Sequence, residues 1–162
     1  MRLTNQTNYA VRMLMYCAAA DRQCRVREIA DLYGLSEAFL LKILRQLTAK
    51  GFMTTVRGRA GGVRLARPAA EIRLGEVVRA MEGFTLAECF EPGSECPILS
   101  SCGFNGALNE ALAAFLAVLD RTTLADLVDN ERNLNVLVEL NRSKEVPFRP
   151  SHAIAASRPA GA

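Results

Sequence analysis

The chain has 162 residues and a mass of 17.7 kDa, the size of one ordinary domain with room for an appended segment. Half of the residues are hydrophobic and 23% are charged, which excludes a wholly disordered chain. The net charge of +3 divides unevenly, because residues 1–80 carry 14 basic against 6 acidic side chains and residues 81–162 carry 6 against 11.

Three helices are predicted in the first 50 residues, from apolar residues that recur at intervals of three and four. They cover residues 5–20, 26–33 and 36–49. Gly34 stands at the C-cap position of the second helix, and Ser36 is suited to cap the third.

A β-hairpin is predicted next. Residues 52–56 have the composition of a strand, residues 57–62 form a glycine-rich turn, and residues 63–66 form the returning strand. A further helix covers residues 74–81. This is the order of elements in a winged helix-turn-helix: a helix, a short helix, a glycine turn, another helix and a hairpin. We therefore predict that residues 1–82 form a DNA-binding domain of this kind.

The second half begins with an irregular loop over residues 83–104, which contains three cysteines. A long helix is predicted within residues 105–142, and four apolar residues recur on one of its faces: Leu108, Leu112, Phe115 and Leu119. Such a stripe fits either the protein core or a homodimer interface. Residues 143–162, which include the single histidine, predict a disordered tail. The predicted fold is mainly α with a small β-hairpin wing and a C-terminal dimerisation helix.

No apolar stretch reaches the ~20 residues that a membrane span needs, and the N-terminus lacks the features of a signal peptide. We therefore expect a cytoplasmic protein with no membrane contact. The basic first half favours a polyanionic partner, although an uneven spread of solvated surface charge is the alternative.

The predicted contacts with DNA come from the third helix and from the hairpin. On the helix, the residues that point away from the apolar face are suited to the major groove: Glu37, Ala38, Leu41, Lys42 and Arg45. On the hairpin, basic side chains surround glycines that allow close approach to phosphates: Arg57, Gly58, Arg59, Gly61, Gly62 and Arg64. Two such units in a homodimer would bind a roughly palindromic double-stranded operator. A solvated helix face and an ordinary exposed turn are the alternatives.

The five cysteines fall into two groups. Cys17 is predicted to be a small buried hydrophobic residue, and Cys24 to be an exposed thiol in a polar turn. Cys89, Cys96 and Cys102 lie within 14 residues, and thiolates are ligands of both iron–sulfur clusters and zinc. Their spacing is not the C-x-x-C of a zinc knuckle, and three free thiols are a further alternative. Because the sequence shows no base near them, an enzyme is not expected.

Several segments resemble the Rrf2 family of bacterial transcriptional regulators, over about residues 1–135. They are Met1–Thr4 with Tyr9–Arg12, Val56–Leu65 and Thr123–Val128. Within the family, residues 5–19, 87–91, 96–97 and 101–103 are most similar to the iron regulator of rhizobia.

The resemblance implies a homodimeric winged-helix repressor in which Cys89, Cys96 and Cys102 hold one iron–sulfur cluster per chain. In such regulators the form with a 4Fe-4S cluster binds operators of iron-uptake genes. Iron shortage or oxygen leaves a 2Fe-2S form and then cluster-free protein, which releases DNA. Alternatives are a nitric-oxide or redox sensor of the same family, or a zinc-binding or thiol protein of another class.

Two residues of the first helix are candidate neighbours of the cluster. Some nitric-oxide sensors of the family supply a carboxylate ligand from the partner subunit where this chain has Asn8, whose amide is a poor ligand for iron. We therefore expect a weak or exogenous fourth ligand and a fragile cluster. Arg12, one helical turn further on, is expected to face the cysteine loop and to couple it to the DNA-binding domain. The cluster-biogenesis regulator of the family has a Glu at the position of Leu41. The operator sequence of that regulator is therefore not expected to apply to this chain.

Overall fold

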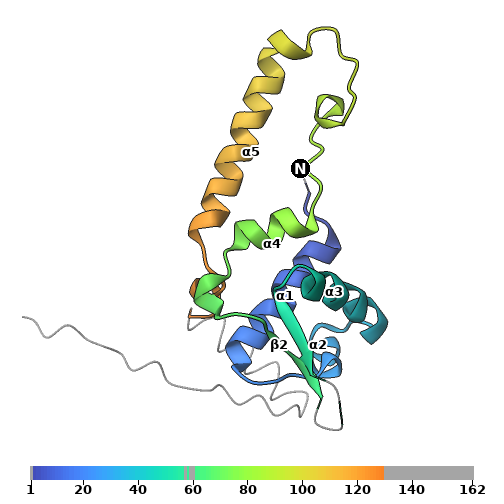
Figure 1. Cartoon of the computed structure of the whole chain (residues 1–162), viewed down its shortest axis with the longest axis vertical. Coiled ribbons are helices and arrows are strands. Elements are labelled where there is room, and N and C mark those ends of the chain that lie inside the picture. Colours follow the sequence, from blue (N-terminus) through green and yellow to red (C-terminus); the bar gives the residue numbers. More distant parts are fainter. Residues whose placement is uncertain (1, 57, 59–60, 130–162) are drawn as a thin grey trace, which may run out of the picture.

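The computed structural model describes residues 2–56, 58 and 61–129. The predictions for Arg57, Arg59 and residues 130–162 lie outside this part of the chain. The molecule is elongated, with a compact domain at one end and a long helix, α5, that extends from it (Figure 1). None of the described helices is long and apolar enough to cross a membrane.

The three predicted N-terminal helices are present, and each begins or ends at a residue suited to that position. Helix α1 (Asn5–Ala20) is capped by Thr4, whose hydroxyl accepts a hydrogen bond from the Thr7 N–H. Helix α2 (Val26–Tyr33) ends at Gly34, which has the left-handed conformation with φ 65°. Helix α3 (Glu37–Ala49) is capped by Ser36.

The hairpin is also present, although both strands are shifted slightly from the prediction. Strand β1 (Met53–Val56) pairs antiparallel with β2 (Gly62–Leu65), with Met53 opposite Leu65. Phe52 is buried and its N–H donates to the Leu47 carbonyl, so this residue belongs to the turn that follows α3 rather than to the strand. A short 3₁₀ helix η1 (Ala69–Glu71) and helix α4 (Leu74–Met81) follow.

The core lies between α1, α2, α3 and the hairpin. Its largest fully buried side chains are Tyr16, Met13, Leu14, Ile29, Leu40, Ile43, Leu47, Met53, Ile72, Leu124, Val77 and Thr7. The predicted burial of Cys17 is confirmed. The prediction for Cys24 is wrong, because this residue has no exposed surface. Its backbone forms an antiparallel bridge to Val63 of β2, so the hairpin covers the turn around Cys24, whose residues are polar in the sequence.

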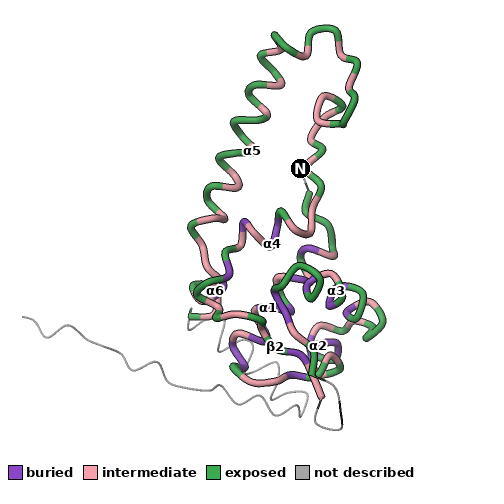
Figure 2. Tube along the Cα trace, in the orientation of Figure 1, coloured by how far each residue is buried: buried purple, intermediate pink, exposed green. Residues whose placement is uncertain are grey.

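The second half of the chain extends away from this core and then returns to it. The loop contains two 3₁₀ turns, η2 (Glu88–Phe90) and η3 (Leu99–Ser101), and leads to α5 (Gly103–Arg121). No residue of α5 is fully buried, as its exposed and half-buried surface in Figure 2 shows. Helix α6 (Leu124–Val128) then packs against α1.

The end of α5 is fastened to α4 by several polar contacts. The Arg79 guanidinium donates two hydrogen bonds to the Asp120 carboxylate, at 2.6 and 2.5 Å. Arg73 donates to the Asp120 carbonyl at 2.7 Å, and the Leu74 N–H donates to the Thr122 carbonyl at 3.0 Å. Leu124, with no exposed surface, completes the core of the compact domain. The sequence-based division into consecutive segments did not anticipate this return.

Candidate DNA-binding face and cysteine loop

Helix α3 presents the predicted recognition surface to solvent. Its apolar face, with Leu40, Ile43 and Leu47, has no exposed surface and fixes the helix on the core. All five residues predicted to meet DNA lie on the outer side of the helix, exposed to solvent: Glu37, Ala38, Leu41, Lys42 and Arg45. The Glu37 carboxylate also lies 3.9 Å from the guanidinium of Arg27 on α2.

The wing lies beside this surface, and its glycines have different roles. Gly58 is exposed with φ 110°, a conformation that favours glycine, and its carbonyl accepts a hydrogen bond from the Gly61 N–H. Gly62 instead faces the protein, since a Cβ atom there would lie 2.4 Å from the Cys24 carbonyl oxygen. Arg64 on β2 is exposed. The structure therefore leaves Gly58 and Arg64 available to DNA, whereas Gly62 serves packing.

Arg12 lies between two aromatic rings, which the sequence reasoning missed. Its guanidinium carbon is 5.3 Å from the Tyr9 ring centre and 5.5 Å from that of Tyr33 on α2. The Tyr9 ring packs edge-on against Phe39 of α3, with centres 5.8 Å apart. Within one chain, Arg12 thus supports the helices of the DNA-binding domain rather than the cysteine loop. The i, i+3 spacing of Tyr9 and Arg12 was the available signal.

Asn8, one helical turn before Arg12, lines a cavity of about 450 Å³ between α1, α4 and α5. Its wall includes Asn8, Leu74, Val78, Phe115 and Leu119. Two residues of the predicted dimerisation stripe therefore face α4 of their own chain. All four residues of that stripe are half-buried, whereas Phe104 and Val118 are 67% and 53% exposed.

The three cysteines of the loop are half-buried and lie in different local structures. Cys89 is in η2, Cys96 precedes η3, and Cys102 is the N-cap of α5. The Cys102 sulfur accepts a hydrogen bond from the Asn105 N–H at 3.5 Å. Among the described residues, no three His, Cys, Asp or Glu side chains gather into a metal site, so one chain alone does not bring these thiols together. As a donor set, three thiols fit an iron–sulfur cluster.

The loop is fastened to α1 at its first residues. The Glu82 carboxylate accepts a hydrogen bond of 2.6 Å from the Thr4 N–H, directly before α1. Burial raises the pKa of Glu82, but hydrogen bonds from Thr7 and Thr4 outweigh burial and leave the pKa below its ordinary value. The Glu82 carboxylate therefore connects the start of the cysteine loop to the start of the DNA-binding domain.

A model of a protein family, described as "Iron-dependent Transcriptional regulator", matches residues 3–130. The chain belongs to the Rrf2 family. This result agrees with the fold described above, a helical domain with a two-stranded wing. An Rrf2 protein is a DNA-binding transcriptional regulator.

Two relatives and a solved structure extend this result. Protein aau3 of Rhizobium meliloti (strain 1021) is 54% identical over 96% of this chain and 100% of its own length. The HTH-type transcriptional regulator NsrR of Bacillus subtilis (strain 168) is 41% identical over 86% of this chain and 99% of its own. The structure of T. potens IscR superposes with a TM-score of 0.65 at 26% identity, over 80% of this chain and 88% of that one.

Proposed function

We propose that this Rrf2 regulator is a homodimeric repressor that controls iron-uptake genes through an iron–sulfur cluster. Cys89, Cys96 and Cys102 would hold a 4Fe-4S cluster, convertible to 2Fe-2S, and the protein would release its operator as that cluster is degraded by iron shortage or oxygen. The observation that carries the proposal is the set of three thiols on a loop tied to α1 by Glu82 and to α5 by Cys102. The description of the family model as an iron-dependent transcriptional regulator supports iron as the signal.

The cluster itself would be the part of the regulator that responds to iron and oxygen, because it would form only when iron is available and would be degraded by oxygen. The chain supplies the rest: thiolate donors, the Asn105 N–H directed at the Cys102 sulfur, and the link from Glu82 to Thr4. Binding would favour one arrangement of the loop and α5 in the dimer over another, and so change the separation of the two α3 helices. No residue of α5 is fully buried in one chain, which agrees with a helix that a second chain covers.

A nitric-oxide or redox sensor built on the same cluster is the second candidate. It is favoured by the 41% identity to NsrR. Asn8 favours the iron sensor, since an amide is a weaker iron ligand than a carboxylate and leaves a cluster that is more readily lost. The rates at which the loaded protein reacts with nitric oxide and with an iron chelator distinguish the two candidates.

Native mass spectrometry of the anaerobically purified protein, recorded while a chelator is added, tests the proposal. We expect a dimer with one four-iron cluster per chain that passes through two-iron forms to cluster-free protein. One zinc ion per chain, or no metal after anaerobic reconstitution, would refute cluster sensing and leave DNA binding by α3 and the wing untouched. A cluster that stays intact for hours under a strong chelator would contradict the iron sensor in particular.

The R45A substitution is expected to weaken specific operator binding. An Arg that donates to a guanine edge contributes about 1–3 kcal/mol, so the affinity should fall by about 5- to 150-fold. The fold should persist, since Arg45 is exposed and alanine favours helices. Fluorescence anisotropy with an operator selected from random DNA measures the effect. R121A, at the exposed end of α5, is the control, and an equal loss in both variants would contradict base recognition by Arg45.

A further inference from the structure

The junction between α4 and α5 places a glycine of one helix against a carboxylate of the other. Gly75 is buried in the first turn of α4. A Cβ atom at this position would overlap a carboxylate oxygen of Asp120, in the last turn of α5, and would lie 2.8 Å from the carboxylate carbon. Glycine is unfavourable inside a helix, but here it allows the end of α5 to approach α4 closely.

The Asp120 carboxylate is held in this position by two arginines of the same chain segment. Arg79, one helical turn after Gly75, donates one hydrogen bond to each carboxylate oxygen. Two hydrogen bonds of this kind fix the relative orientation of the guanidinium and the carboxylate. Arg73 donates to the Asp120 carbonyl, so the backbone of this residue is held as well. The side chains of Arg79 and Asp120 are 44% and 37% exposed, and such a pair contributes little to stability. Its contribution is the direction in which α5 leaves the domain.

This direction is fixed relative to the predicted recognition helix. Val77 and Val78 are buried and fasten α4 to the core. Helix α4 packs against α1, and α1 packs against α3. The Asp120–Arg79 pair therefore joins α5 to a continuous set of packed helices that ends at α3.

The side of α5 opposite to this junction carries exposed apolar residues. Val118 is 53% exposed and Phe104 is 67% exposed. Because each residue of a helix turns by about 100°, these two residues lie on nearly the same side, and Asp120 lies roughly opposite to both. One side of the helix is thus held by α4, and the other is available to a second chain.

We propose that the Asp120–Arg79 pair, seated on Gly75, determines which half-site separation the dimeric regulator accepts. This inference rests on the homodimer of the proposed function, with α5 of one protomer against its partner. The direction of α5 then sets the separation of the two α3 helices. Each base pair added between half-sites moves one of them by roughly 3.4 Å along the DNA and roughly 34° around it. Asp120 is therefore a positioning residue for operator recognition.

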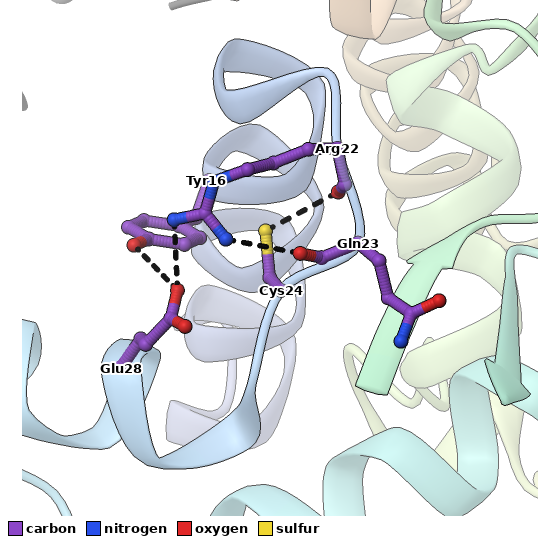
Figure 3. A network of polar contacts seen from close by, with 5 residues as sticks. All are labelled: Tyr16, Arg22, Gln23, Cys24 and Glu28. Carbon is purple, nitrogen blue, oxygen red and sulfur yellow. Dashed lines mark hydrogen bonds and ion pairs between the residues drawn. The ribbon is translucent and has the colours of Figure 1, made fainter. Parts of the chain in front are cut away.

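The first measurement is amide hydrogen exchange of the free full-length protein. The Leu74 N–H donates to the Thr122 carbonyl beside the pair, so its exchange reports on the junction. D120N keeps the shape of the side chain and removes its charge, and exchange at Leu74 should become about tenfold faster. E28Q is the matched control, because it breaks the Arg22–Glu28 ion pair, which joins the turn after α1 to α2 (Figure 3). Equal exchange in D120N and wild type overturns the proposal.

The second measurement is competitive binding to operators whose two half-sites are moved apart or together by single base pairs. The wild type should prefer one spacing. In D120N, the preference for this spacing over one changed by two base pairs should fall about tenfold, with the affinity for a single half-site unchanged. R79Q should cause the same shift, and the double variant D120N/R79Q no larger one, because both substitutions remove one contact. An equal loss of affinity at every spacing would indicate a merely structural role and overturn the proposal.

G75A tests the geometry of the junction without changing a charge. Its Cβ displaces the Asp120 carboxylate, so it should alter the spacing preference as D120N does. A spacing preference that D120N, R79Q and G75A all retain overturns this inference alone. A wild type that is monomeric by native mass spectrometry and shows no preferred spacing refutes the homodimer and this inference together. If the form that binds DNA carries no cluster, iron sensing is refuted, and the spacing comparison is made on that form.

Discussion

Replacing Cys96 with alanine is expected to abolish iron-dependent operator binding while leaving a folded protein. Cys96 is half-buried in the loop and contributes nothing to the compact core, so its loss removes a ligand without opening a cavity there. Without the cluster, operator affinity should fall to the level of non-specific DNA, a decrease of about 10³-fold or more. Iron content and mobility-shift titrations of anaerobic protein measure the two effects.

S100A is the matched control for this variant, because it alters an exposed side chain in the same loop and removes no thiol. It should keep the iron content and operator affinity of the wild type. If C96A retained an operator affinity that still responded to iron, the cysteine loop would not be the sensor. If it lost iron but bound the operator as tightly as the loaded protein, cluster control of DNA binding would be refuted.

Replacing Gly62 with alanine is expected to destabilise the DNA-binding domain by about 2 to 4 kcal/mol. The new Cβ would lie 2.4 Å from the Cys24 carbonyl oxygen and 2.9 Å from Gln23 Cγ. The former is a backbone atom that moves only with the two hydrogen bonds between Cys24 and Val63. Overpacking of this kind costs about 1–3 kcal/mol, and weakening the one hydrogen bond that this carbonyl accepts, from the Val63 N–H, costs about 1 kcal/mol more.

Thermal unfolding followed by circular dichroism measures this loss, which corresponds to a fall in Tm of roughly 6–12 °C for a chain of this size. G83A is the control, since a Cβ there meets no atom within 4 Å. Its Tm should stay close to that of the wild type. An equal Tm for G62A and wild type would show that β2 moves away from Cys24 at no energetic cost.

The local features of the fold were predictable from the sequence. Apolar spacing and the capping residues Gly34 and Ser36 gave the three helices, and the exposed face of α3 follows directly from that periodicity. The features that sequence reasoning missed depend on contacts between distant segments. Cys24 is buried because its backbone pairs with Val63, and Gly62 serves packing for the same reason. Neither contact leaves a local pattern, since the turn around Cys24 is polar in sequence.

The cysteine loop likewise shows that sequence patterns identify candidate residues but not how these residues are arranged in space. The identity and spacing of its three thiols are visible in the sequence, and these two features alone suggest thiolate ligation. The arrangement of the thiols in space is not local, and no three His, Cys, Asp or Glu side chains of the described residues gather into a metal site. By contrast, the return of the chain through Leu124 is determined within one chain, but a single buried residue after a long helix gives too little signal to predict it.

Within one chain, the polar contacts that join α5 to the compact domain lie at the C-terminal end of the helix, so α5 can be compared to a lever. Asp120, Thr122 and Leu124 fix its last turn to the compact domain, whereas Cys102 stands at its first turn. Its 19 residues give an arm of about 28 Å. A tilt of about 5° at the fixed end therefore moves the Cys102 end by about 2.5 Å. Conversely, for a rigid helix of this length, a displacement of ångström size at the cysteine end would correspond to a rotation of a few degrees at the fixed end.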